Sequence, residues 1–135
     1  MSSPWQPPAV GDIVWCHFPE LPTRDPGPKP RPALVVNVEM RDDGVIVGVA
    51  YGTSKRLANL KAGEFATTRV HAAAFQLAGL GYDTKFDCKQ VIDLPWSDRF
   101  FKVPPHPRHG QTPKLGTLHP SVYHAAKAAF RAGAR

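Results

Sequence analysis

The chain has 135 residues, of which 42% are hydrophobic and 21% charged, a composition typical of a globular protein that buries a single core. No apolar run approaches the roughly 20 residues that a membrane-spanning helix needs, and the first ten residues lack the basic start and apolar centre of a secretory signal. The composition therefore favours one domain over residues 1–135, located in the cytoplasm.

Basic residues outnumber acidic ones and give a formal net charge of +6. A surplus of this size points to a polyanionic partner, more often nucleic acid than membrane, although a basic surface can also serve solubility alone. The cations gather in or beside predicted connections, where binding residues tend to lie. Three groups can be distinguished: Arg24, Lys29, Arg31 and Arg41; Lys55, Arg56 and Lys61; and Arg99, Lys102, Arg108 and Lys114.

The two cysteines, Cys16 and Cys88, each lie within an apolar segment. Neither belongs to a paired C-x₂-C spacing of the kind that structural zinc sites use. In a reducing compartment both are predicted to be small buried hydrophobic residues. The sequence therefore predicts neither a metal site nor a cofactor.

The N-terminal part of the chain predicts an irregular start, a strand and a loop. Residues 1–9 hold three prolines and are predicted to form an irregular lead-in. The segment GDIVWCHF, residues 11–18, predicts a strand with apolar side chains on both faces. Residues 19–32 contain six prolines, and because proline cannot donate to a sheet ladder this segment is predicted to be a loop.

The middle of the chain predicts more strands and a short helix. PALVVNVEM, residues 32–40, predicts a second strand, and the Asp-Asp-Gly step after it predicts a hairpin turn into a third, VIVGVAYG, residues 45–52. A weaker strand pattern covers residues 64–70. A short helix is predicted around residues 71–80, where glycines end the pattern.

The C-terminal part predicts a long strand, a loop and a helix. In residues 86–95, FDCKQVIDLP, an alternating pattern places Phe86, Cys88 and Gln90 on one face of a strand. Residues 95–113 are predicted to be a loop with a helical turn at WSDRFF, and residues 118–132 a helix with proline near its start. Several short strands before one terminal helix predict a mainly β fold, as a strongly bent sheet or barrel.

Four segments of the sequence resemble the MazF/PemK family of toxin endoribonucleases, and they occur in the family's order. They are GDIVW at 11–15, RPALVV at 31–36, VAYGTS at 49–54 and FDCKQVIDLP at 86–95. The resemblance implies an SH3-like barrel of the MazF/PemK/CcdB kind, a homodimer, metal-independent cleavage of single-stranded RNA, and neutralisation by a cognate antitoxin. The sequence departs from the family pattern in the proline-rich loop, where Asp25 stands loosely for a glutamate.

In metal-free cleavage of RNA the ribose 2′-OH attacks the adjacent phosphorus. The reaction needs one group to accept the hydroxyl proton, one to protonate the leaving 5′-oxygen, and hydrogen-bond donors that stabilise the negative charge on the phosphoryl oxygens. Arg31 lies between two prolines at the start of the second predicted strand, so a rigid element could aim its planar guanidinium at a phosphate. The alternative is that Arg31 caps the sheet edge and pairs with a carboxylate. The resemblance favours a catalytic Arg31.

Thr53 and Ser54 place adjacent hydroxyls at the end of the third predicted strand. The resemblance assigns Thr53 to the catalytic threonine position, although a Thr-Ser step is also an ordinary turn opener. Asp87 is a further catalytic candidate because its carboxylate could accept a proton or bind a nucleobase edge. The alternative is a strand aspartate that pairs with Lys85 or Lys89.

Histidine is the usual acid–base residue near neutral pH, and the chain has six. His17 lies beside the proline-rich loop and could face the same cleft as Arg31, which makes it a catalytic candidate. His106 and His109 lie in the predicted loop 95–113 and are interpreted as phosphate contacts or as residues without a role.

Exposed aromatic rings can stack on single-stranded bases for about 1–3 kcal/mol each. Among the loop aromatics Trp96 is the predicted base platform, with core packing as the alternative for this residue and for Trp5, Phe100 and Phe101. The complete set of predicted RNA-binding residues is Arg24, Lys29, Ser54, Lys55, Arg56, Lys85 and Trp96.

Two other functions remain open. PGPKPRP, residues 26–32, resembles a ligand of SH3 or WW domains, but its continuation into an apolar strand argues against an accessible linear motif. A barrel of this kind could also be a CcdB-like gyrase inhibitor or a non-catalytic nucleic-acid binder, since a fold alone does not select a function. The RPALVV and Thr-Ser segments favour the nuclease.

Overall fold

The computed structural model describes residues 5–106 and 110–133. Its strands are β1 (Asp12–Cys16), β2 (Arg31–Arg41), β3 (Gly44–Thr53), β4 (Glu64–Thr67), β5 (Thr84–Pro95) and β6 (Lys114–Thr117). Its helical elements are α1 (Ala72–Ala78), the 3₁₀ turn η2 (Pro120–Val122) and α2 (Tyr123–Gly133). Within this part of the chain no helix is long and apolar enough to cross a membrane.

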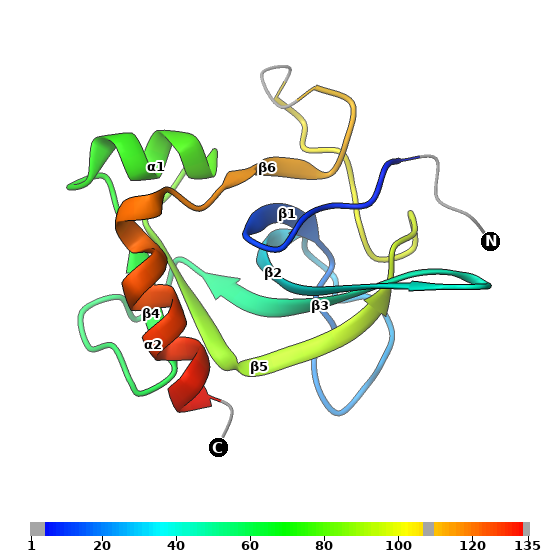
Figure 1. Cartoon of the computed structure of the whole chain (residues 1–135), viewed down its shortest axis with the longest axis horizontal. Coiled ribbons are helices and arrows are strands. Elements are labelled where there is room, and N and C mark those ends of the chain that lie inside the picture. The colour runs from blue at the N-terminus through cyan, green and yellow to red at the C-terminus, as the bar shows by residue number, and fades with distance from the viewer. Residues whose placement is uncertain (1–4, 107–109, 134–135) are drawn as a thin grey trace.

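The described strands form one antiparallel sheet in the order β4-β5-β3-β2-β1-β6 (Figure 1). This arrangement confirms the predicted mainly β fold with a C-terminal helix, but the sheet does not close into a hydrogen-bonded barrel, because β4 and β6 do not pair. Helix α1 lies between these two edges and contacts both. Gly79 makes the contact with β6 possible: its φ is 70°, and a Cβ there would collide with the carbonyl oxygen of Leu115.

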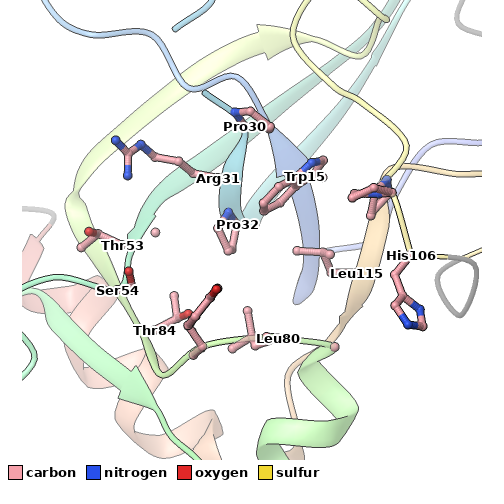
Figure 2. Close-up of a pocket in the computed structure, with 16 residues that line it drawn as sticks. Trp15, Pro30, Arg31, Pro32, Thr53, Ser54, Leu80, Thr84, His106 and Leu115 are labelled. Atoms are coloured by element: carbon pink, nitrogen blue, oxygen red, sulfur yellow. The ribbon is translucent and has the colours of Figure 1, made fainter. Parts of the chain in front are cut away.

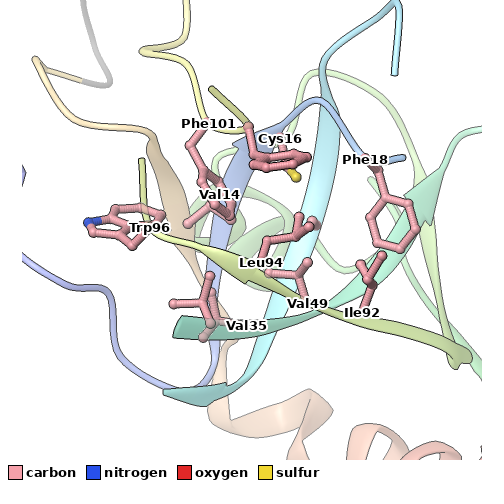
Figure 3. Packing of buried hydrophobic residues seen from close by; sticks show 12 residues of the cluster. Val14, Cys16, Phe18, Val35, Val49, Ile92, Leu94, Trp96 and Phe101 are labelled. Carbon is pink, nitrogen blue, oxygen red and sulfur yellow. The ribbon is translucent and has the colours of Figure 1, made fainter. Parts of the chain in front are cut away.

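Both faces of the sheet are buried, as the apolar pattern of the first strand predicts. One core contains Val14, Val35 and Val49 and is covered by aromatic residues from the loop after β5 (Figure 3). The other contains Ile13 and Leu34 and is covered by α1 and α2. Successive strand residues therefore serve different cores, which follows from the two-residue repeat of a strand.

Strand β5 changes faces at a bulge, and the simple alternation predicted for it is therefore wrong. Tyr51 of β3 pairs with Asp87, whereas its neighbour Ala50 pairs with Val91, so residues 88–90 have no partner on β3. Phe86, before the bulge, and Cys88, at its start, pack in the helix-covered core, and after the bulge Ile92 and Leu94 pack in the opposite one. Gln90 is exposed.

The C-terminal helix predicted over residues 118–132 is present as η2 followed by α2. His119 caps the start, since its Nδ1 accepts a hydrogen bond from the backbone N–H of Ser121 at 3.0 Å, and Pro120 follows in the first turn. Helix α2 packs against β5 and β4. The short strand β6 was not predicted, and the strand pattern at 64–70 shortens to the four residues of β4.

Candidate active site

Arg31 and Thr53 come together because of the sheet register. Strand β2 begins at Arg31, which pairs with Cys16 of β1, and Ala33 pairs with Tyr51 of β3. Extending that antiparallel register by two residues brings Arg31 opposite Thr53. A Cβ on Gly52 would collide with the carbonyl oxygen of Pro32, so glycine is the residue that allows the two strand ends this close approach.

The two side chains line a hollow of about 300 Å³, here named the Arg31 pocket. Figure 2 shows Arg31, Thr53 and Ser54 on one side and Trp15, Leu115 and His106 on the opposite side. Leu80 and Thr84 lie between the two sides. The walls therefore come from segments far apart in sequence: the starts or ends of β2, β3 and β5, the outer face of β1, and the loop before β6.

The guanidinium of Arg31 forms no ion pair with any carboxylate in the described residues. Its Cζ lies 5.7 Å from the centroid of the Tyr51 ring, and that ring packs edge-on against Phe18 at 5.2 Å. Arg31 is half-buried, so a cation held by an aromatic face keeps its hydrogen-bond donors available. The alternative role, a sheet-edge arginine paired with a carboxylate, does not match this geometry.

Thr53 presents a fixed hydroxyl to the same pocket. Its Oγ1 accepts a hydrogen bond from the backbone N–H of Lys55 at 3.2 Å. A hydroxyl that accepts one bond can still donate its own hydrogen, so Thr53 can donate to an oxygen bound beside Arg31. Ser54, which is exposed, adds a second hydroxyl at the rim.

His17, a catalytic candidate from the sequence, does not line the Arg31 pocket. Its Nδ1 lies 2.8 Å from the carbonyl oxygen of Gly27, and its own carbonyl accepts from the N–H of Gly27 at 3.2 Å. These reciprocal contacts close the proline-rich loop, so the imidazole is used for structure. Of the histidines in the described part of the chain, His106 is the one that lines the pocket; His109 lies outside the described residues.

A second hollow, here named the basin, adjoins the first and shares Thr53 with it. It has a volume of about 680 Å³, within the roughly 300–1,000 Å³ of typical ligand sites. It is lined by Ala58 and by residues with polar side chains: Tyr51, Thr53, Lys55, Arg56, Asn59, Lys61, Glu64, Lys85, Asp87 and Gln90. The basin thus collects the second cationic group of the sequence together with Asp87.

Lys85 is buried in the floor of the basin, which corrects its prediction as an RNA-binding residue. Its Nζ lies 3.1 Å from Glu64 Oε1 and donates to the carbonyl oxygen of Arg56 at 3.0 Å. Only 7% of the lysine side chain is exposed. Binding a phosphate would require breaking this buried ion pair, so Lys85 supports the site and does not contact a ligand.

Asp87 lies in the basin and is not part of the Arg31 pocket. Its Oδ1 accepts from the N–H of Lys89 at 2.9 Å, and its Oδ2 accepts from Gln90 Nε2 at 2.8 Å. Both bonds depend on the bulge, which brings residues 89 and 90 back beside residue 87. Neither Lys85 nor Lys89 pairs with the Asp87 carboxylate through its ammonium group. Because Asp87 lies outside the Arg31 pocket, its position does not favour proton transfer there.

Trp96 is only 4% exposed, so its prediction as a base platform is wrong. Its ring centroid lies 4.6 Å from that of Phe101 and 6.0 Å from that of Trp5, and its Nε1 donates to the carbonyl oxygen of Gln6 at 3.1 Å. The burial follows because the indole packs with Phe101 in the apolar core over one face of the sheet (Figure 3). Two aromatic residues of the described chain line the pocket: the exposed Tyr82, and the half-buried Trp15 on the strand face opposite the core residues Val14 and Cys16.

The remaining predicted cations lie on the surface. Arg24 and Lys29 are exposed in the proline-rich loop and line neither the Arg31 pocket nor the basin. Asp25 pairs with Arg99 at 2.9 Å, and both side chains are exposed. Lys55 and Arg56 lie at the basin, as a role in phosphate contact requires.

Both cysteines are buried free thiols, as predicted. Burial raises the pKa of Cys16, and burial together with the charge of Asp87 raises the pKa of Cys88 to about 11. Cys88 therefore stays protonated at neutral pH. In the described residues no three side chains among histidine, cysteine, aspartate and glutamate gather as a metal site would require.

Comparison with solved structures shows a match that covers most of both chains. An endoribonuclease in complex with its cognate antitoxin, from a mycobacterial species, is 16% identical and superposes with a TM-score of 0.60 over 95% of each chain. No curated protein matches the sequence. The family described as the PemK-like, MazF-like toxin of type II toxin-antitoxin systems matches residues 9–132. Because that match spans nearly the whole sequence, the chain belongs to the PemK-like, MazF-like family of toxins.

Proposed function

We propose that this protein is a metal-independent endoribonuclease that cleaves single-stranded RNA as the toxin of a type II toxin–antitoxin system. The observation that carries the proposal is Arg31: a half-buried guanidinium without a carboxylate partner in the described residues, beside the Thr53 hydroxyl in one pocket. Family membership and the endoribonuclease named in the structural match support the same activity.

The pocket offers donors for the reacting phosphate. In the proposed reaction the ribose 2′-oxygen forms a bond to phosphorus, the bond to the 5′-oxygen breaks, and the products are a 2′,3′-cyclic phosphate and a 5′-hydroxyl. The guanidinium of Arg31 binds the phosphoryl oxygens with two parallel N–H groups as negative charge develops there. The Thr53 hydroxyl donates to the same group.

Proton transfer needs a residue of another type, because arginine does not lose its proton at physiological pH. His106 lies across the pocket from Arg31 (Figure 2), and imidazole is the side chain suited to exchange a proton near neutral pH. We assign His106 the proton-transfer role, for which His17 and Asp87 are the candidates from the sequence.

Single-stranded RNA is the proposed substrate for two reasons. Attack by a 2′-OH requires a ribose, so DNA lacks the nucleophile. The attacking and leaving oxygens must also lie in line through phosphorus, a geometry that a flexible strand can reach and a regular duplex cannot. Lys55 and Arg56 beside the pocket would hold the backbone electrostatically.

Two protein partners belong to the proposal. A cognate antitoxin would neutralise the toxin in the cytoplasm, and the structural match supports this because that endoribonuclease is bound to its own antitoxin. We also propose a homodimer. Exposed apolar side chains border a groove of about 500 Å³ beside α2, among them Val10, Tyr123 and Phe130. Sedimentation that gives only the 14.8 kDa chain mass at micromolar concentration would contradict the dimer.

The test of the activity is cleavage of matched substrates in the presence of EDTA. We expect the purified protein to cut single-stranded RNA, to leave duplex RNA and DNA intact, and to produce 2′,3′-cyclic phosphate ends. Equal cleavage of DNA, or activity only with an added divalent metal, would contradict the proposed chemistry. A protein that binds RNA without cutting it would favour the non-catalytic alternative.

A further inference from the structure

We propose that the basin binds the nucleotide next to the reacting phosphate and that Asp87 with Gln90 selects guanine there. The inference rests on the proposed nuclease function, since it places a second subsite beside the pocket where cleavage would occur. The two hollows share Thr53, so a strand bound at Arg31 has a continuous path into the basin. Four features of the basin support this reading.

The first feature is a fixed wall. One oxygen of Glu64, Oε1, accepts from the backbone N–H of Lys61 at 2.8 Å and lies 3.1 Å from Lys85 Nζ. The same ammonium donates to the carbonyl oxygen of Arg56 at 3.0 Å. A buried ion pair thereby holds the segment between β3 and β4 at both Arg56 and Lys61, so the wall is in place before any ligand binds.

The second feature is the charge of the rim. Lys55, Arg56 and Lys61 are all exposed and all line the basin. The carboxylates Glu64 and Asp87 also line the basin, and Glu64 is engaged with Lys85 in the floor. A rim of cations above a neutralised floor suits the phosphates on either side of a bound nucleotide.

The third feature is the orientation of Asp87. Hydrogen bonds from Lys89 N–H and Gln90 Nε2 fix its two oxygens at 2.9 and 2.8 Å. Each oxygen has a second lone pair, so the carboxylate can still accept a pair of hydrogen bonds. Because the carboxylate has no hydrogen to donate, the Gln90 amide must turn its nitrogen toward Asp87.

The fourth feature is the chemical match with one base. A carboxylate offers two adjacent acceptors, and the Watson–Crick edge of guanine offers two adjacent donors, N1–H and the N2 amino group. Adenine, cytosine and uracil each place an acceptor where one of these donors would be needed. Reading an unstacked base through this edge is the usual mode for single-stranded RNA.

The test uses short chimeric oligonucleotides that contain one ribose, so that cleavage occurs at one bond, with each of the four bases placed in turn on either side. The parent is expected to cleave the guanine member about tenfold faster than the others at one of the two positions, as one good bidentate base contact predicts. Titration of the four nucleoside 3′-monophosphates by NMR measures the same preference without cleavage.

Asp87→Asn is the decisive variant, because an amide replaces one acceptor with a donor. Its Nδ2 would turn the Gln90 amide around, and the side chain would then present one donor and one acceptor where the carboxylate presents two acceptors. We expect the guanine preference to fall below threefold while cleavage of the other members continues. Asp93→Asn is the matched control: it makes the same change on the same strand, in an exposed residue that lines neither hollow.

Gln90→Met provides a second route if Asp87→Asn unfolds, since it removes the amide that orients Asp87 and should reduce the preference. A parent that cleaves all members within threefold of one another, or an Asp87→Asn protein that keeps the preference, would overturn the inference and leave the nuclease intact. If the parent cleaves nothing but binds guanosine 3′-monophosphate selectively, the nuclease proposal fails and the base site stands.

Discussion

The Arg31 pocket and the basin are adjacent, yet they use charged side chains in opposite ways. In the basin the buried Lys85 and Glu64 satisfy each other and hold backbone in place. In the pocket Arg31 has an aromatic ring beneath it and no carboxylate partner within the described chain. The ion pair therefore holds the structure of the basin in place, whereas the cation in the Arg31 pocket remains available to bind a ligand. Substitutions should therefore change stability in the basin and reaction rate in the Arg31 pocket.

The largest expected effect is on catalysis by Arg31→Ala. We expect single-turnover cleavage to fall by about 10²–10³, equal to about 3–4 kcal/mol, because a donor to the developing phosphoryl charge acts mainly in the transition state. RNA affinity and the melting temperature should change little. Arg31→Lys keeps the charge but loses the planar fork, so it should also remain impaired.

Arg41→Ala is the control for Arg31→Ala, since it removes an arginine from the other end of the same strand. Arg41 pairs with Glu39 at 2.9 Å with both side chains about half exposed (49%), and such pairs contribute about 0–1 kcal/mol. If folded Arg31→Ala cleaves within threefold of the parent, Arg31 is a structural residue and the contrast between the two hollows fails.

The next effect is on stability, through Lys85→Met. Removing one partner of a buried ion pair leaves the other charge without compensation, which typically costs about 3–5 kcal/mol. Denaturation in urea should show this loss, and the double variant Lys85→Met with Glu64→Leu should recover much of it. A loss below about 1 kcal/mol, as for the exposed Arg41 pair, would mean that the pair does not hold the basin.

A third prediction separates two histidines. His106→Gln should lower the cleavage rate by about 10² and remove the corresponding limb of the pH–rate profile, as expected for loss of a general acid or base. His17→Gln should instead lower the free energy of unfolding by about 1 kcal/mol, through its contact with Gly27. The opposite pattern, with cleavage lost in folded His17→Gln and kept in His106→Gln, would assign the catalytic role to His17 and contradict the assignment of His106.

The smallest effect is expected at the rim of the basin. Lys55→Ala should weaken RNA binding only a few-fold, equally for all sequences, and reduce the slope of log affinity against log salt by about one. Lys102→Ala removes a lysine that is exposed but lines neither hollow, so it should leave that slope unchanged. An effect of Lys55→Ala that depends on base identity would contradict a purely electrostatic rim.

Much of the fold could be predicted because its signals are local. Alternating apolar residues indicate β1, β2, β3 and most of β5, and the Asp-Asp-Gly turn indicates one hairpin. The position of Arg31 at the start of a strand, and of Thr53 at the end of another, also follows from these patterns. Their juxtaposition needed only the register of neighbouring antiparallel strands.

The errors arise where distant segments decide the outcome. Lys85 reads as a surface lysine because its partner Glu64 lies 21 residues away in sequence. Trp96 is buried because it packs on the sheet face that carries Val14 and Val35. Its position in a loop does not indicate this contact. The bulge after Asp87 reverses the faces of β5, and nothing in the alternating pattern marks it. The four-residue β6 exists only because β1 provides a partner.

The incomplete closure of the sheet has a consequence for self-association. An open sheet exposes unpaired N–H and C=O groups at its edges, and long flat edges promote edge-to-edge aggregation. Here each edge strand has only four residues, Glu64–Thr67 and Lys114–Thr117, and α1 contacts both. The helix thus covers the two short edge strands and hinders their pairing with a strand of a second molecule.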